Sequence, residues 1–209
     1  MKGRVTLLSL IGFAAVAMRG EPARAQESQG SQDLQVFAGE MFGDRLTERP
    51  LFDARVRLDD TATFGGRYTY HFADGWGIQL SAGYSPTRAG HAANGSDNLG
   101  LTTVDWDLEW DLGPLLHFRG RPIVPYTVIG VGYAWASLDQ PIYRLGAGGP
   151  VVNDSNGYTA NVGLGAKYFL WDNVFIGLDA RYRYLSKLVS EGGQGLNTAE
   201  TTFSVGYRF

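Results

Sequence analysis

The last seven residues, Phe203-Ser204-Val205-Gly206-Tyr207-Arg208-Phe209, alternate between two kinds of side chain. The odd positions are aromatic or aliphatic, and the even positions are small or charged. Successive side chains of a β-strand point to opposite faces, so this stretch predicts a strand with one apolar and one polar face. We expect the apolar face to contact lipid and Arg208 to point into a closed barrel.

The same two-residue period recurs in seven further segments. In all but the first of the eight, the bulky apolar face carries no charge, and the opposite face holds most of the charges of the segment. This pattern predicts an all-β fold, an eight-stranded antiparallel up-and-down transmembrane β-barrel. The predicted strands cover residues 34–42, 62–72, 76–85, 101–112, 125–136, 158–170, 174–184 and 199–209.

Aromatic residues stand near the ends of several predicted strands, with small aliphatic residues between them. Tyr158 and Tyr168, for example, flank Ala160, Val162, Leu164 and Ala166. An apolar band between two aromatic girdles is typical of the lipid-facing surface of a transmembrane barrel. The first strand has a weaker pattern, and there we expect Glu40 to point inward and Phe37 and Met41 to point outward.

The lengths of the connections between strands predict how the barrel is oriented across the membrane. Short turns at 73–75 and 171–173 alternate with longer polar links at 43–61, 86–100, 137–157 and 185–198. Short turns on one rim and long loops on the other are typical of a barrel whose loops face the cell exterior and whose turns face the periplasm. An even strand number then places both termini in the periplasm. The 113–122 link belongs with the short turns but is longer than they are.

The N-terminus has the pattern of a signal peptide. Lys2 and Arg4 precede an uncharged apolar run over residues 5–18, and Ala23-Arg24-Ala25 matches a signal-peptidase site. We expect cleavage after Ala25, which leaves one barrel domain over 26–209. The run is too short to span a bilayer comfortably, because a membrane helix needs about 20 apolar residues.

Composition narrows the range of functions. The chain has no cysteine, which excludes disulfides, thiolate nucleophiles and Cys-based metal sites. Residues 1–25 hold four of the 18 basic and one of the 21 acidic residues, so the predicted mature chain has a net charge of −6. This acidic balance gives no support to nucleic-acid binding.

With these residues in view, the chain resembles the small eight-stranded outer-membrane barrels, the OmpA/OmpX/OmpW-like and opacity-protein-like group. The resemblance covers essentially the whole predicted mature chain and is carried by the signal peptide, by Pro125-Tyr126 with Gly130-Val131-Gly132-Tyr133, by residues 161–165 and by the C-terminal strand. It implies a bacterial outer-membrane location among lipid and lipopolysaccharide. It also implies that the barrel-assembly machinery recognises Phe203, Val205, Tyr207 and Phe209 as an assembly signal.

Charged residues on the predicted inner faces form the main candidate site. An eight-stranded barrel has a lumen barely wide enough for side chains, so charges inside it must pair. We expect an ion-pair network that plugs the lumen, rather than a cation-lined pore or a Ca²⁺ site, and we expect no metal and no cofactor. Its predicted members are Glu40, Arg67, Asp105, Asp107, Glu109, Asp111, Lys167, Asp179, Arg181, Arg183 and Arg208.

Three other functions stay open at this point. The barrel could be a narrow pore or transporter for small solutes, or a soluble lipocalin-like barrel with its two faces inverted. It could also be a lipid A-modifying enzyme, for which His91, Ser96 and Asp97 are the only group that resembles a catalytic set. We favour a non-enzymatic barrel with a structural or surface-interaction role, in which the loops meet any extracellular ligand.

Overall fold

The computed structural model describes residues 30–43, 57–91, 95–113, 115–116, 122–138, 142–143, 150–152, 155–186 and 195–209. Among these residues, no helix is long and apolar enough to cross a membrane. The predicted signal peptide lies outside the described residues and stays a prediction.

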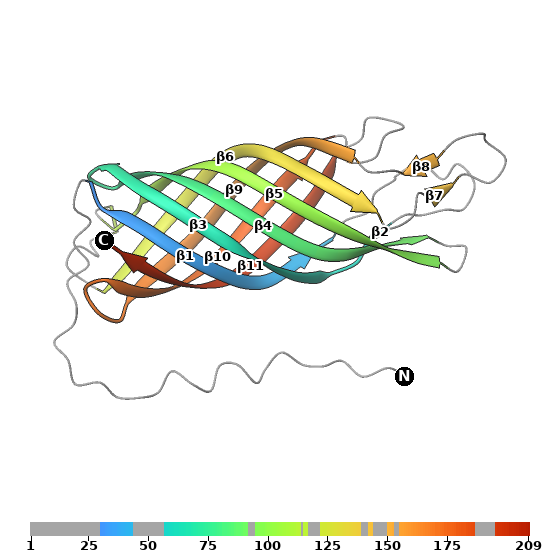
Figure 1. The fold of residues 1–209 in the computed structure, drawn as a ribbon. Helices are drawn as coiled ribbons and strands as arrows, with labels where there is room; N and C mark the ends of the chain where they lie inside the picture. The colour runs from blue at the N-terminus through green and yellow to red at the C-terminus, as the bar shows by residue number, and fades with distance from the viewer. Residues whose placement is uncertain are drawn as a thin grey trace.

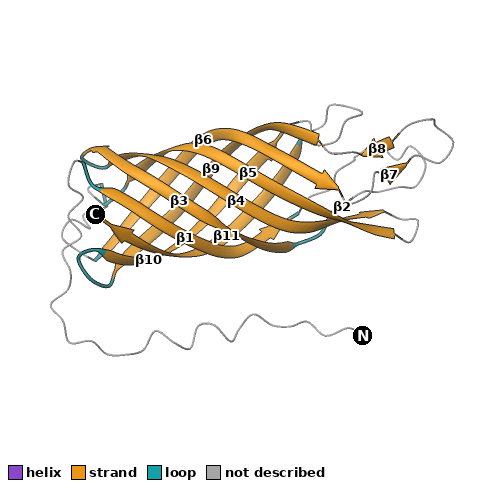
Figure 2. Ribbon diagram, in the orientation of Figure 1, coloured by secondary structure: helices purple, strands orange, loops and turns teal. Residues whose placement is uncertain are grey.

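Eight long antiparallel strands form a closed barrel, which confirms the predicted fold (Figures 1 and 2). Around the barrel the order is β4-β3-β1-β11-β10-β9-β6-β5, and pairing of β4 with β5 closes the ring. The short strand β2 (Arg57–Leu58) extends the sheet beside β4, and β7 (Ile142–Tyr143) pairs with β8 (Pro150–Val152). The barrel strands are β1 (Gln32–Phe42), β3 (Thr61–Ala73), β4 (Trp76–His91), β5 (Gly95–Asp111), β6 (Ile123–Leu138), β9 (Ser155–Phe169), β10 (Val174–Leu185) and β11 (Leu196–Arg208).

The first and last strands meet at the rim that carries the short turns. The backbone N–H of Gln32 donates to the carbonyl of Phe209 at 2.9 Å, and the N–H of Phe209 donates back at 3.0 Å. The N–H of Arg208 donates to the carbonyl of Asn173, in the turn between β9 and β10. Figure 1 shows the C-terminus at this rim. Closure pairs strands that an open sheet would leave as edges, which a structure surrounded by hydrocarbon requires.

The apolar faces of the strands cover the outside of the barrel. On β11 the odd residues point outward, with Phe203 51% and Phe209 57% exposed, whereas Ser204 and Arg208 are buried. The same holds for β9, where Leu164 is 63% exposed and Lys167 is fully buried. A soluble barrel would bury the apolar face, so the alternative with inverted faces is wrong.

The register predicted for the first strand is wrong. In β1, Glu40 lies on the outer face, and Phe37 and Met41 are buried inside. Both parities of 34–42 contain apolar residues, so the alternation within this segment does not determine which face is inner. The side chain that decides the register is Asp33, one residue before the predicted start, which pairs with Arg208 across the β1–β11 ladder.

The strands on the long-loop side extend further than predicted. β4 continues to His91 and β5 begins at Gly95, with paired backbones throughout, so most of the expected 86–100 loop is a protruding hairpin. Pro86 in this stretch indicated a loop, yet it pairs in register with Gly100, and the inner face continues through Ser85 and Thr87. The ends of the 43–61, 137–157 and 185–198 links are also strand.

Substitution of two leucines, one on β9 and one just beyond it, tests the assignment of the lipid-facing surface. Leu164 lies between the girdle residues Tyr158 and Tyr168, and Leu170 lies at the short-turn rim. Leu164→Arg should destabilise the barrel in lipid vesicles by about 2–4 kcal/mol, because it puts a cation into hydrocarbon, and Leu170→Arg by only about 0–1 kcal/mol. Denaturant unfolding followed by heat-modifiable gel migration measures both. Equal effects would contradict the assignment of the outer face.

Candidate functional site: the charged barrel interior

The inner face of the barrel carries a set of buried ionisable side chains. Each is at most 6% exposed, although together they span strands from all sides of the ring. Charges at such depth are stable only when opposite charges and hydrogen bonds surround them. The set comprises Asp33, Arg67, His71, Asp105, Asp107, Glu109, Lys167, Asp179, Arg181, Arg183, Glu200 and Arg208.

Arg181 on β10 is the centre of this network. Its guanidinium donates to Asp107 on β5 at 2.6 Å, to Gln79 on β4 at 2.5 Å and to Asp179 on its own strand at 3.2 Å. In the ring, β4 is four strands away from β10 in either direction, so the Arg181–Gln79 bond joins opposite walls. The side chain of Arg181 therefore crosses the lumen.

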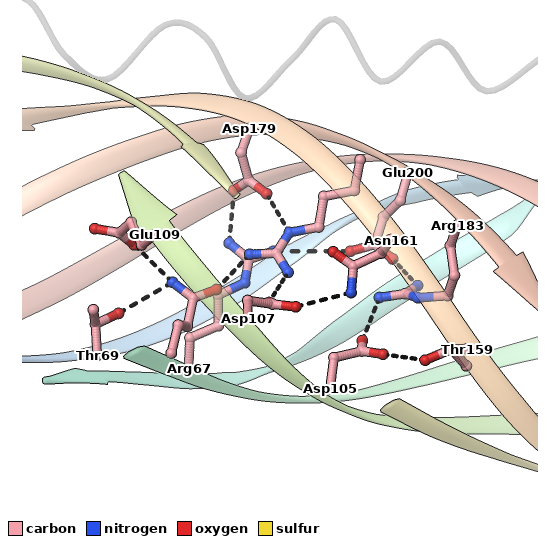
Figure 3. Close-up of polar contacts among 12 residues, drawn as sticks. Arg67, Thr69, Asp105, Asp107, Glu109, Thr159, Asn161, Asp179, Arg183 and Glu200 are labelled. Carbon is pink, nitrogen blue, oxygen red and sulfur yellow. Dashed lines mark hydrogen bonds and ion pairs between the residues drawn. The ribbon is translucent and has the colours of Figure 1, made fainter. Parts of the chain in front are cut away.

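Arg67 extends the network on the β3 wall (Figure 3). It donates to Asp179 at 2.6 Å and to the hydroxyl of Thr202 at 3.0 Å. The Arg67 guanidinium also lies 4.2 Å from the ring centroid of Phe37, within the range of a cation–π interaction. Phe37 therefore packs against this cation inside the barrel, contrary to the outward position predicted for it.

Arg183 forms a second crossing on the long-loop side of Arg181 (Figure 3). It donates to Asp105 on β5 and to Glu200 on β11, both at 2.8 Å. Asp105 also accepts from the hydroxyl of Thr159 at 2.5 Å. Both oxygens of this carboxylate are therefore satisfied in the barrel interior.

Asp33 is the centre of the network at the short-turn rim. Its carboxylate accepts from Lys167 at 2.9 Å and from Arg208 at 2.6 and 2.9 Å, and it lies 3.1 Å from Nε2 of His71. Lys167 donates a further bond to Glu109 at 2.5 Å. The rings of the Val124, Phe169 and Phe175 cluster cover these cations, with Arg208 stacked 4.6 Å from the Phe169 centroid.

Asp33, His71 and Glu109 have the donor types of a metal site. One ligand atom from each lies within 4.8 Å of the others. The ammonium of Lys167, however, contacts both carboxylates, and Arg208 contacts Asp33, so a divalent cation would have to displace one positive charge and approach another. We therefore assign this cluster to the ion-pair network.

Nine of the eleven residues predicted for the network lie inside the barrel and form ion pairs with one another or with Asp33 and Glu200. Two predicted members do not. Glu40 is on the outer face, and Asp111 is half-buried at the end of β5, where it accepts a hydrogen bond from the N–H of Gly113 at 2.6 Å.

Asp33 and Glu200 were missed by the sequence analysis, as was the bridging role of Gln79. Glu200 has the same parity as Arg208 on the last strand, so the alternation already placed it inward. Asp33 and Glu200 take the places of Glu40 and Asp111. Among the residues that the structure describes, the interior holds six carboxylates beside five Arg and Lys cations and His71. These described residues therefore leave the lumen close to charge neutrality.

Glycines on the inner faces of β6 and β9 provide room for this network. A Cβ on Gly130 would collide with the carboxylate of Asp107, and a Cβ on Gly132 with that of Asp105. One on Gly163 would meet Arg181. These glycines leave space for the crossing side chains.

The histidine-containing group proposed for catalysis lies at the tip of the β4–β5 hairpin. There His91 pairs with Gly95 and Gly90 with Ser96 through the backbone. The side chains of His91, Ser96 and Asp97 lie outside the described residues.

Residues 5–209 match the family model described as outer membrane protein beta-barrel domain. The chain belongs to this family. A search of curated protein sequences finds no significant match. The family places the protein in the bacterial outer membrane, in agreement with the apolar outer surface of the barrel.

Solved structures of this architecture are similar along almost their full length. The outer membrane protein OprG from Pseudomonas aeruginosa is 15% identical with a TM-score of 0.61, and the match covers 90% of this chain and 98% of OprG. Neisserial surface protein A is 18% identical with a TM-score of 0.55, over 87% of this chain and all of that one. Outer membrane protein W of E. coli is 17% identical with a TM-score of 0.53, over 88% and 100%. At these identities the likeness concerns the fold alone.

Removal of Arg181 tests the network. Arg181→Ala should lower the free energy of unfolding by about 3–5 kcal/mol, because it leaves Asp107 and Asp179 buried beside an excess of negative charge. The midpoint of denaturant unfolding in lipid vesicles measures the change. Arg88→Ala is the matched control, since Arg88 is exposed on the outer face of β4, and its midpoint should stay unchanged. An unchanged midpoint for Arg181→Ala would count against the network.

Proposed function

We propose that the protein is a non-conducting outer-membrane barrel with a structural or surface-interaction role. Its lumen is plugged by ion pairs, and its long connections are displayed to the cell exterior. The main support for a plugged lumen is that charged side chains bridge strands that are far apart in the ring. Arg181 contacts both β4 and β5 from β10, Lys167 on β9 contacts Asp33 on β1, and Arg67 on β3 contacts Asp179 on β10.

These bonds occupy the cross-section that a solute would need. Each crossing joins strands that are three or four places apart in a ring of eight. A solute could pass only after the crossing pairs separate, which would expose several buried charges at once. The geometry therefore favours a plug over the narrow pore or transporter that was the alternative function.

The orientation of the barrel belongs to the same proposal. The short turns, the start of β1 and the end of β11 share one rim, and the protruding β4–β5 hairpin lies at the other. We place the short-turn rim and both termini in the periplasm, because short periplasmic turns and longer extracellular connections are usual for outer-membrane barrels. Lipopolysaccharide would then surround the long-connection end.

Partners follow from this placement. The outer face would contact outer-membrane lipid and lipopolysaccharide, and an extracellular ligand would bind the long connections. The barrel-assembly machinery would recognise the C-terminal strand, whose residues Phe203, Val205, Tyr207 and Phe209 all point outward. The proposal assigns the protein no catalytic role. Altered lipid A acylation on expression, abolished by His91→Ala, would contradict that assignment.

Single-channel recording tests the plug. In planar bilayers, the wild-type protein and the outer-face variant Arg88→Ala should be silent at high protein load, and Arg181→Ala should show openings because one crossing is removed. Only protein that shows the heat-modifiable gel migration of a folded barrel should be added. Steady openings of the wild type would overturn the plug and support a pore for small solutes.

Surface labelling tests the orientation of the barrel. The chain has no native cysteine, so only the introduced cysteine can react with the label. A cysteine at Asn156, exposed near the long-connection end of β9, should react with a membrane-impermeant maleimide on intact cells. A cysteine at Asp172, exposed in the short turn before β10, should react only after the outer membrane is permeabilised. The reverse pattern would invert the proposed orientation.

A further inference from the structure

Glu40 is a charged side chain on the lipid-facing surface of the barrel. It is exposed on the outer face of β1, and within the described chain its carboxylate forms no ion pair or hydrogen bond. Its outer-face neighbours along the strand, Ala38 and Phe42, are apolar. An ionisable side chain surrounded by lipid is costly, so such a residue marks a functional site whose partner has to be identified.

The strand registers place Glu40 towards the long-connection end of the apolar band. It lies eight residues above Gln32, which is hydrogen-bonded to Phe209 at the short-turn rim. Eight residues of a strand tilted by about 40° rise by roughly 20 Å, and the apolar band of an outer-membrane barrel is about 25 Å tall. Tyr84 and Tyr182 mark the same level, since each lies eight residues above the start of its own strand.

A hydroxyl lies beside Glu40 on the neighbouring strand. Thr201 is directly opposite Glu40 across the β1–β11 ladder and is also exposed on the outer face (Figure 1). It lies eight residues above Phe209, so the two side chains are at nearly the same depth in the membrane. A carboxylate accepts hydrogen bonds and a threonine hydroxyl donates one, so the pair combines an acceptor with a donor.

The surface around this pair is shallow. Four of the outer-face residues that adjoin it are exposed alanines, Ala38, Ala62, Ala180 and Ala199. On either side the aromatic surface resumes with Phe64 and Tyr182, which are 49% and 52% exposed. In membranes, small residues let two proteins approach closely enough for polar side chains to form hydrogen bonds between them.

The equal depth of the two polar side chains makes this surface self-complementary. A symmetric dimer of barrels inserted in the same direction has its two-fold axis along the membrane normal, and rotation about that axis preserves depth. With the axis between Glu40 and Thr201, the carboxylate of each copy faces the hydroxyl of the other. Such an isologous contact forms two hydrogen bonds from a single pair of residues.

We propose that the protein forms a homodimer in the membrane through the outer faces of β1 and β11, with reciprocal hydrogen bonds between Glu40 of one copy and Thr201 of the other. A second copy suits this surface better than lipid does, because acyl chains offer no donor and lipid phosphates carry the same sign of charge as Glu40. The interface leaves the ion-pair network untouched, so the dimer does not depend on whether the lumen is plugged.

Energy transfer between labelled barrels tests the dimer. The label is attached to a cysteine at Asp172, exposed in a short turn, in a chain without native cysteine. In phosphatidylcholine vesicles with EDTA, donor- and acceptor-labelled barrels should show energy transfer that falls on dilution with lipid. Glu40→Leu and Thr201→Val should each raise the dissociation constant about 10- to 100-fold, because two hydrogen bonds are lost. Glu40→Gln keeps an acceptor and should have a smaller effect.

The matched control is Thr102→Val, which removes a hydroxyl from the outer face of β5, three places from β1 and four from β11 in the ring. Its dissociation constant should equal that of the wild type. Glu40→Leu removes a charge from the lipid-facing surface, so its denaturant midpoint should not fall. Equal dissociation constants for Glu40→Leu and the wild type would overturn the interface, as would a wild type that stays monomeric. Energy transfer that requires added Ca²⁺ would also overturn it, since a cation would then join the copies.

Cross-linking tests the position of the axis. Ala62 lies eleven residues above Ala73 at the rim end of β3, and Ala199 lies ten above Phe209, on the other side of the polar pair. The axis exchanges the two sides, so Ala62 of one copy should face Ala199 of the other. A mixture of Ala62→Cys and Ala199→Cys barrels should therefore be cross-linked by a short bismaleimide, whereas neither variant alone should be. A mixture that gives no more product than the separate variants would place the contact elsewhere and overturn this interface.

Discussion

Ionised side chains in this protein can be buried only in the lumen, because the outer surface of the barrel faces hydrocarbon. In the described part of the chain, eleven acidic, arginine and lysine side chains occupy the interior, and they are stable there because each meets opposite charge. Arg181 shows the principle best, since it satisfies Asp107, Asp179 and Gln79 from three strands at once. Much of the architecture serves this arrangement, including the inner glycines and the aromatic rings that cover the cations.

The network also links stability to function. A bond between opposite walls holds the ring closed and at the same time occupies its cross-section, so the contacts that stabilise the barrel are those that would block a solute. Function in such a protein would reside in the connections beyond the rim.

The sequence predicted the faces of the barrel strands after β1 because most of their bulky residues share one parity and their charges the other. The same logic failed at β1, where Leu34 and Val36 lie on one face and Phe37 and Met41 on the other, so that both faces are apolar. The correct register there depends on the ion pair between Asp33 and Arg208. It also failed at Pro86, where turn-forming composition marks a hairpin that extends beyond the ring. The position of Glu200 inside the barrel was within reach of the alternation, whereas its pairing with Arg183 was not.

By itself, the amino-acid order determined the strand number, the membrane-facing surface and the charged character of the lumen, because each depends on a local period of two. Which cation meets which carboxylate was decided only by tertiary structure. Arg67 and Asp179 are 112 residues apart, and Lys167 and Asp33 are 134 apart. Their contact requires ring closure and the stagger of eight strands, quantities that no single strand contains.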